Sequence, residues 1–201
     1  SMAFDALNLD AIISTASGCG VQLAEYSILS PLPGARETAS ELEAGNGCDG
    51  NTPPSKRFSA KVMDISAFLA VAGGWDEIKL APLAHKIAVH EPCSLRNVLR
   101  GSTFSYALLA RIPGVQIAPL AGNDQCCGAA GTYFLDQPEM AKVLLHDKIT
   151  AINTSGARYL ATSNVGCAMH LASALREGRS EVEVLHPVTL IARQMNINSE
   201  I

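Results

Sequence analysis

Short apolar segments alternate with helical patterns along most of the 201 residues, and this alternation limits the possible folds more than any other feature. The apolar segments have the length and composition of buried parallel strands, and they cover residues 11–15, 86–89, 115–119, 159–163 and 182–185. Helical patterns occupy residues 20–29, 58–71, 103–111, 138–153, 168–176 and 188–195. Strands and helices in this order predict an α/β fold, a layered domain with a mostly parallel sheet flanked by helices.

The composition is that of a chain with a large aliphatic core, since 48% of the residues are hydrophobic and 17% are charged. This excludes a disordered chain. The net charge of −4 comes from 15 basic and 19 acidic residues without a basic cluster, so no nucleic-acid partner is expected. No apolar run reaches the roughly 18 residues of a membrane-spanning helix, and the N-terminus lacks the pattern of a secretion signal. We therefore expect a soluble, cytoplasmic protein.

Four of the six cysteines follow predicted strands, at the points where the chain turns toward a helix. Cys93, the adjacent pair Cys126 and Cys127, and Cys167 all occupy such positions. In a parallel sheet these turns share one edge, the carboxyl ends of the strands, where ligands bind. Structural disulfides are disfavoured in a cytosolic chain with its own core, and adjacent thiols on a Gly-rich turn are poor packing material. The cysteines therefore predict a metal or cluster site at the carboxyl ends of the strands.

A short internal repeat relates the beginning of the chain to its last third. Residues 13–23 resemble residues 161–171, because each segment runs from a strand through small polar residues into Gly-Cys and then a helix. The second copy has three further cysteines before Cys167, whereas only eighteen residues precede Cys19 in the first. We therefore expect the first copy to be truncated.

The cysteine pattern resembles the cysteine-rich CCG domain shared by the glycolate oxidase iron–sulfur subunit, related lactate-utilisation proteins and the cysteine-rich component of heterodisulfide reductase. The family pattern is a Cys, then Cys-Cys-Gly, then Cys-x-x-Cys. Here 32 residues separate Cys93 from Cys126, and 39 residues separate Cys127 from Cys167. The residues around both motifs are most similar to the glycolate oxidase branch. His170 stands where the family has its final cysteine.

The resemblance implies four ligands for an iron–sulfur cluster of the [4Fe–4S] type, namely Cys93, Cys126, Cys127 and Cys167. The same thiols also suit a closed zinc site, so zinc is the alternative. The site is expected to be empty in protein prepared in air or truncated, because exposed clusters are fragile and thiols oxidise.

Three further residues are weaker candidates. His170 is a possible fifth ligand, since imidazole replaces thiolate on iron in some clusters, and a solvent-facing role is an equal alternative. Cys19 would belong to the site of the truncated first copy. His90 is interpreted as a residue that packs against the ligands or hydrogen-bonds to them.

The resemblance also divides the chain. Residues 1–35 would be the C-terminal tail of a truncated first CCG unit, and residues 58–201 would be a complete second unit. Residues 36–57 between them would be a flexible Gly/Pro-rich insert, in which Cys48 is an incidental exposed thiol.

The implied function is electron transfer. The chain would be the C-terminal cysteine-rich domain of the iron–sulfur subunit in a flavin-dependent glycolate or other 2-hydroxy-acid dehydrogenase complex. It would pass electrons from flavin-containing dehydrogenase subunits toward a membrane acceptor, with possible peripheral association at the inner face of the membrane. No dinucleotide loop, nucleophile elbow or motif-based carboxylate pair is visible, so no catalytic residue is assigned and the chain would be catalytically incomplete alone. The alternatives are a zinc-binding structural or assembly module and, more distantly, a disulfide reductase subunit.

Overall fold

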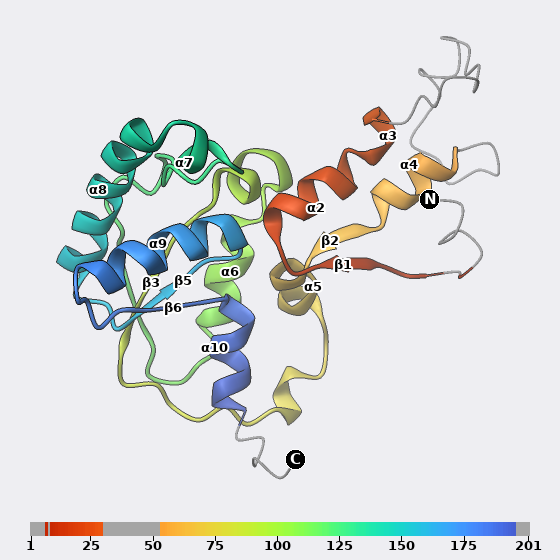
Figure 1. The fold of residues 1–201 in the computed structure, drawn as a ribbon. Coiled ribbons are helices and arrows are strands. Elements are labelled where there is room, and N and C mark those ends of the chain that lie inside the picture. The colour runs from red at the N-terminus through yellow and green to blue at the C-terminus, as the bar shows by residue number, and fades with distance from the viewer. Residues whose placement is uncertain (1–6, 8, 30–52, 196–201) are drawn as a thin grey trace, which may run out of the picture.

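A computed structural model describes residue 7 and residues 9–29 and 53–195 of the protein. Two parallel sheets form its framework (Figure 1). The larger sheet has the strand order β4–β3–β5–β6, with β3 at Lys86–Val89, β4 at Gln116–Ala118, β5 at Tyr159–Ala161 and β6 at Glu183–Leu185. The smaller sheet pairs β1 (Ile12–Ser14) with β2 (Val62–Asp64). The predicted α/β class with parallel strands and flanking helices is confirmed.

The central strands are buried on both faces, which explains their nearly continuous apolar sequences. Side chains alternate between the faces, so Ile87 and Val89 of β3 pack on one side while Ala88 packs on the other. The first face is covered by α6 (Ser102–Leu109) and α10 (Pro187–Gln194), and the second by α8 (Pro138–Ser155) and α9 (Val165–Glu177). The sheet therefore has a helical layer on each face, and the loops that follow the strands lie at its carboxyl edge.

The helix predicted over residues 58–71 is wrong. The chain instead forms α4 (Pro54–Ala60), then β2, then α5 (Ile65–Val71). Asp64 separates the last two elements, because its side chain accepts a hydrogen bond from the Ser66 N–H at 2.8 Å and so begins a new helix. The residues just before this helix adopt an extended conformation, in which Val62 pairs with Ile12 of β1.

Several further short elements complete the described fold. The helix predicted over 20–29 is divided into α2 (Ser17–Ala24) and α3 (Tyr26–Leu29). A π-helix, η3 (Ser94–Leu99), follows β3, and α7 (Tyr133–Asp136) precedes α8. A 3-10 turn, η2, covers Trp75–Glu77. The π-helix is informative, because such turns are rare and occur frequently at functional sites.

The internal repeat extends further than the sequence match. β1, α2, β2 and α5 follow one another in the same order as β5, α9, β6 and α10, and each pair of strands is parallel. Asp64 and His186 occupy corresponding positions, because each is the N-cap residue of the helix after the second strand and accepts a hydrogen bond from the N–H two residues later. The two copies meet where the Ser17 N–H donates to the Ser163 carbonyl at 3.0 Å.

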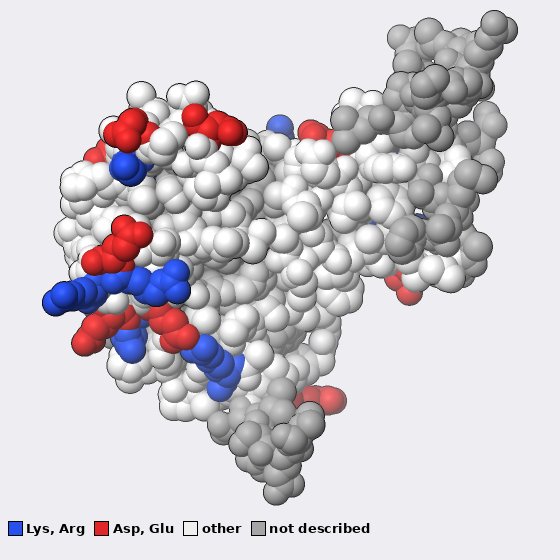
Figure 2. Space-filling view, viewed as in Figure 1, with Lys and Arg blue, Asp and Glu red and all other residues white. Residues whose placement is uncertain are grey.

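Charged side chains on the viewed face gather away from the cysteine edge of the sheet. Figure 2 shows Lys and Arg side chains among Asp and Glu side chains over one side of the molecule. Arg193 and Glu183 form an ion pair, with 2.8 Å between Nη2 and Oε1. The surface over α2 and the first turns of α9 is mostly uncharged (Figure 2). Within the described part of the chain, no helix combines the length and apolar character needed to cross a membrane.

His186 makes the stability of the fold depend on pH. Its Nδ1 accepts from the Val188 N–H at 3.1 Å, while its Nε2 is buried with no hydrogen-bond partner among the described residues. Burial lowers the pKa of His186 from the usual 6.5, and the charge of Asp64 partly opposes this. The folded state thus binds the proton less readily than the unfolded state, so this histidine destabilises the fold as the pH falls below 6.5.

We expect the melting temperature of the wild type to fall by a few degrees more than that of His186→Asn between about pH 7.5 and pH 5.5. Asparagine keeps a helix-capping acceptor and cannot be protonated, so the substitution isolates the titration. Thermal melts of both proteins at the two pH values measure the difference. Equal losses in the two proteins would contradict this role for His186.

Candidate metal centre

The predicted ligands meet in one cavity of about 250 Å³ at the carboxyl ends of the strands. The end of β3, the loop after β4 and the start of α9 each contribute to its wall, and α2 closes one side. Its polar or sulfur-bearing lining consists of Gln22, His90, Cys93, Ser94, Gln125, Cys126, Cys127, Asn164 and Cys167. All four cysteines that the sequence predicts as ligands therefore line the same cavity.

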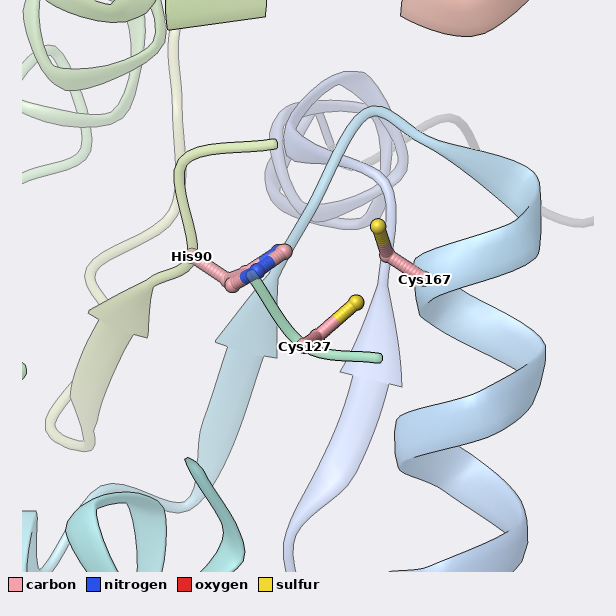
Figure 3. Close-up of side chains that lie close together, drawn as sticks. All are labelled: His90, Cys127 and Cys167. Atoms are coloured by element: carbon pink, nitrogen blue, oxygen red, sulfur yellow. The ribbon is translucent and has the colours of Figure 1, made fainter. Parts of the chain in front are cut away.

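Three buried groups form the inner part of this site (Figure 3). One ligand atom from each of His90, Cys127 and Cys167 lies within 4.8 Å of the other two. The Nδ1 atom of His90 is 3.0 Å from the Thr162 hydroxyl, which leaves Nε2 as the nitrogen available to the thiols. The sequence alone indicates His90 only as a neighbour of the ligands. The structure brings its ring to the thiols themselves, a position that its place directly after a buried strand could have indicated.

Cys93 lies at the entrance to η3. Pro92 and Cys93 end the extended segment after β3, and the Cys93 backbone is already helical at φ −56° and ψ −35°. The thiol is exposed, unlike those of Cys127 and Cys167. The next residue, Ser94, lies 2.9 Å from the Ser17 hydroxyl, oxygen to oxygen, so η3 is joined directly to α2. Cys93 therefore stands on the open side of the centre.

The Cys126–Cys127 turn depends on Gly128. This glycine has φ +88°, and a Cβ atom there would lie 2.5 Å from the Ala141 carbonyl oxygen of α8. Only glycine combines that backbone conformation with so close an approach. The Gly128 N–H in turn donates to the Cys126 sulfur at 3.4 Å. The Gly after the cysteine pair thus holds the turn against α8 and stabilises negative charge on Cys126.

Asn164 fixes Cys167 at the start of α9. Its Oδ1 accepts from the Cys167 N–H at 3.1 Å, and its Nδ2 donates to the Ser94 hydroxyl at 3.3 Å. One side chain therefore caps α9 and joins it to η3. Asn164 is not among the residues predicted from the sequence, although Asn before a helix is a recognisable capping signal.

The thiols differ in their ionisation. The hydrogen bond with Cys167 is the main factor that lowers the pKa of Cys127, and His90 lowers it further. The same hydrogen bond raises the pKa of Cys167, which therefore keeps its proton when Cys127 is a thiolate. Burial is the main factor that raises the pKa of Cys126. The buried pair thus offers one thiolate in the protein alone and a second when a cation displaces the shared proton.

His170 and Cys19 do not line the cavity. The His170 ring packs against Phe134, with 5.3 Å between the ring centroids, and its Nε2 is buried without a hydrogen-bond partner in the described part of the chain. Cys19 is exposed on α2. Gln22, which corresponds to His170 in the first copy of the repeat, does line the cavity. Cys48 lies outside the described residues.

The donor atoms fit a soft metal centre. Thiolate and imidazole are the ligands of iron–sulfur and zinc sites, and four thiols with one imidazole converge here. The cavity exceeds the roughly 30 Å³ that one water molecule occupies in the liquid, so it has room for more than a single ion. An iron–sulfur cluster and a mononuclear zinc ion are therefore both compatible with the donors.

Comparison with known proteins gives consistent matches. Residues 87–172 match the family described as cysteine-rich domain, CCG. The chain is 31% identical over 193 residues to a probable glycolate oxidase iron-sulfur subunit of Bacillus subtilis, across 94% of this chain and 40% of that protein. It is 30% identical over 177 residues to a glycolate oxidase iron-sulfur subunit of Escherichia coli, across 86% and 37%. Lactate utilization protein A of Shouchella clausii is 25% identical over 179 residues, across 88% and 67%. The chain thus spans less than half the length of the two glycolate oxidase subunits.

Proposed function

Because residues 87–172 form a cysteine-rich domain of the CCG family, we propose that this chain is the cysteine-rich part of an iron–sulfur subunit in an oxidoreductase complex. One observation carries the proposal: Cys93, Cys126, Cys127 and Cys167 line a single cavity together with His90. Cys127 and Cys167 also pack in the core, but Cys93 is exposed and Cys126 is half-buried, so packing does not account for the convergence of all four thiols. The names of the relatives, which include two iron-sulfur subunits, support the same conclusion.

The residues of the cavity would hold a [4Fe–4S] cluster, with the four cysteines as ligands. Such a cluster supplies one-electron transfer, at a potential set by ligand charge, hydrogen bonds to sulfur and burial. The chain provides these influences through named groups. The Gly128 N–H donates to the Cys126 sulfur, His90 lies beside Cys127, and the Cys127 and Cys167 side chains are shielded from water.

The electrons would come from a flavin-containing dehydrogenase subunit that oxidises glycolate or another 2-hydroxy acid, and would leave toward a membrane acceptor. The relatives are named for glycolate oxidase and for lactate utilization, which supports a 2-hydroxy acid as the substrate of the complex. We place the complex in the cytoplasm, with peripheral association at the inner face of the membrane.

We also propose that the smaller sheet belongs to a first CCG unit. Its elements, β1, α2, β2 and α5, repeat the order of β5, α9, β6 and α10, and Cys19 occupies the position of Cys167. Because β2 pairs with β1 across the insert, this unit would extend to Val71 rather than ending at residue 35. The second unit would then begin after α5.

A redox titration tests the proposed function. Protein reconstituted with iron and sulfide without oxygen is expected to show broad visible absorption, which reductant bleaches and reoxidation restores. Apoprotein treated with iron alone serves as the control for adventitious binding. Protein that takes up iron and sulfide but shows no reversible bleaching would contradict an electron-transfer role.

One observation favours zinc as the alternative. The ligand atoms of His90, Cys127 and Cys167 are within 4.8 Å of one another, a spacing that a single tetrahedral ion could draw together with Cys93 or Cys126 as the fourth ligand. The protein would then be a structural or assembly module without redox activity. In that case, chelation of stoichiometric zinc would greatly lower the melting temperature, and no redox-active spectrum would be obtained after reconstitution.

A further inference from the structure

Lys148 of α8 is a buried cation close to the cysteine loop. The residue is 3% exposed, and its Nζ donates to the Gly122 carbonyl at 2.5 Å. Among the residues that the structure describes, no carboxylate lies within the 4.0 Å of an ion pair with it. A buried ammonium without a paired carboxylate is unfavourable unless other groups compensate its charge. The site next to Gly122 must therefore supply that compensation.

A second cation, Arg96 of η3, binds the same loop. Arg96 of η3 donates from Nη1 to the Asn123 carbonyl at 2.7 Å and from Nη2 to the Asp124 carbonyl. Three consecutive carbonyls, of Gly122, Asn123 and Asp124, are thus held by Lys148 and Arg96. This arrangement fixes the segment immediately before Cys126 and Cys127.

Nearby acidic groups partly offset the effect of burial on the Lys148 ammonium. Burial is the main factor that lowers the pKa of Lys148, and the negative charge of Cys127 is the largest influence that opposes it. Asp124 and, to a smaller extent, Cys126 act in the same direction. The ammonium therefore interacts with the two adjacent cysteines through space while it binds their loop through Gly122.

We propose that Lys148 is a positioning residue of the cysteine centre, which orders the Cys126–Cys127 loop through the Gly122 carbonyl and places a fixed positive charge beside it. The inference rests on the proposed function, because it concerns the same four cysteines. Arg96 assists by holding the neighbouring carbonyls, but it is more exposed and its charge is better screened by water.

This role has two consequences for the centre. Removing the ammonium loosens the loop that carries Cys126 and Cys127, so the affinity for a divalent metal decreases. A fixed positive charge also stabilises the reduced, more negative form of a redox centre, so its loss lowers the reduction potential. A lysine that only filled space would affect the first property through folding and would leave the second unchanged.

The test compares Lys148→Met with Lys142→Met and Lys148→Arg. Methionine keeps the length of the side chain without its charge, Lys142 is an exposed lysine of the same helix, and arginine keeps the charge at position 148. Metal-free protein is titrated with Co²⁺, and protein reconstituted with iron and sulfide is titrated for its midpoint potential. We expect Lys148→Met to bind Co²⁺ about 10- to 100-fold more weakly and to have a lower midpoint potential. Lys142→Met should match the wild type, and Lys148→Arg should keep the potential.

Unchanged Co²⁺ affinity and potential in a folded Lys148→Met would overturn the inference. If that variant does not fold, Arg96→Met is measured instead, and it should shift both properties in the same direction by a smaller amount. No shift in Arg96→Met would then count against the inference. The outcomes also separate this inference from the proposed function: a wild type that forms no iron–sulfur centre refutes the function, whereas equal potentials in wild type and variant refute only the role of Lys148.

Discussion

Replacing Cys127 with serine abolishes formation of the iron–sulfur centre, and this is the largest effect that we expect from a single substitution. Cys127 is 1% exposed, lines the cavity and is the buried thiol whose pKa is lowered. A serine hydroxyl has nearly the same size but does not ionise near neutral pH, so it cannot supply the soft anionic ligand. Iron content and visible absorption after reconstitution without oxygen should both fall to the background level.

Cys19→Ser is the matched control for this substitution. Cys19 is exposed on α2 and does not line the cavity, so its removal should leave iron content and absorption unchanged. The melting temperature of metal-free Cys127→Ser is measured alongside, because Cys127 packs in the core and its replacement also changes that packing. Full iron loading of Cys127→Ser would show that Cys127 is not a ligand.

Replacing Gly128 with alanine should produce the second large effect, on the fold of the cysteine loop. The φ of +88° costs an alanine about 1–2 kcal/mol, and its Cβ would meet the Ala141 carbonyl oxygen at 2.5 Å. Because that oxygen is part of the α8 backbone, it cannot move aside cheaply, and overpacking of this kind costs about 1–3 kcal/mol more. We expect a loss of about 2–5 kcal/mol in the free energy of unfolding, measured by denaturant titration.

Gly131→Ala separates backbone strain from the collision with α8. Gly131 also has a positive φ, +66°, but a Cβ there would meet no atom within 4 Å. This variant should lose only the strain, about 1–2 kcal/mol. Gly128→Ala should in addition bind less iron, since the turn that carries Cys126 and Cys127 is displaced. Equal destabilisation by the two substitutions would show that α8 does not constrain the turn.

The sequence allowed the larger sheet to be predicted because its strands are buried on both faces. Such strands consist of short apolar runs, and segments 86–89 and 159–163 stand out for that reason. Their order also placed the four cysteines at one edge, since consecutive parallel strands end on the same side. The convergence on one cavity followed from topology, without any knowledge of side-chain packing.

The smaller sheet was harder to predict, because β2 has three residues and lies between two helical segments. A strand this short shows little alternation of apolar and polar residues. The helix is interrupted at Asp64, whose side chain accepts a capping hydrogen bond from the Ser66 N–H. The apolar spacing of residues 58–71 is compatible with one continuous helix. Pairing with β1, fifty residues away in sequence, decides the outcome.

The roles of His90, His170 and Lys148 also depend on tertiary contacts. His90 joins the thiols because Thr162 of a neighbouring strand segment orients its ring, and His170 packs on Phe134 instead of lining the cavity. A lysine on a helix is usually solvated, and nothing local in the sequence distinguishes Lys148 from the exposed Lys142. Spacing predicts which residues lie near the centre, but packing decides which of them face it.

The metal content of protein isolated without oxygen tests the central claim most directly. Iron, zinc and acid-labile sulfide are measured on the same sample, with EPR spectra before and after reduction. We predict several iron atoms and matching sulfide per chain, with an EPR signal that depends on the redox state. One zinc ion per chain, without iron or sulfide, would contradict an iron–sulfur centre at Cys93, Cys126, Cys127 and Cys167.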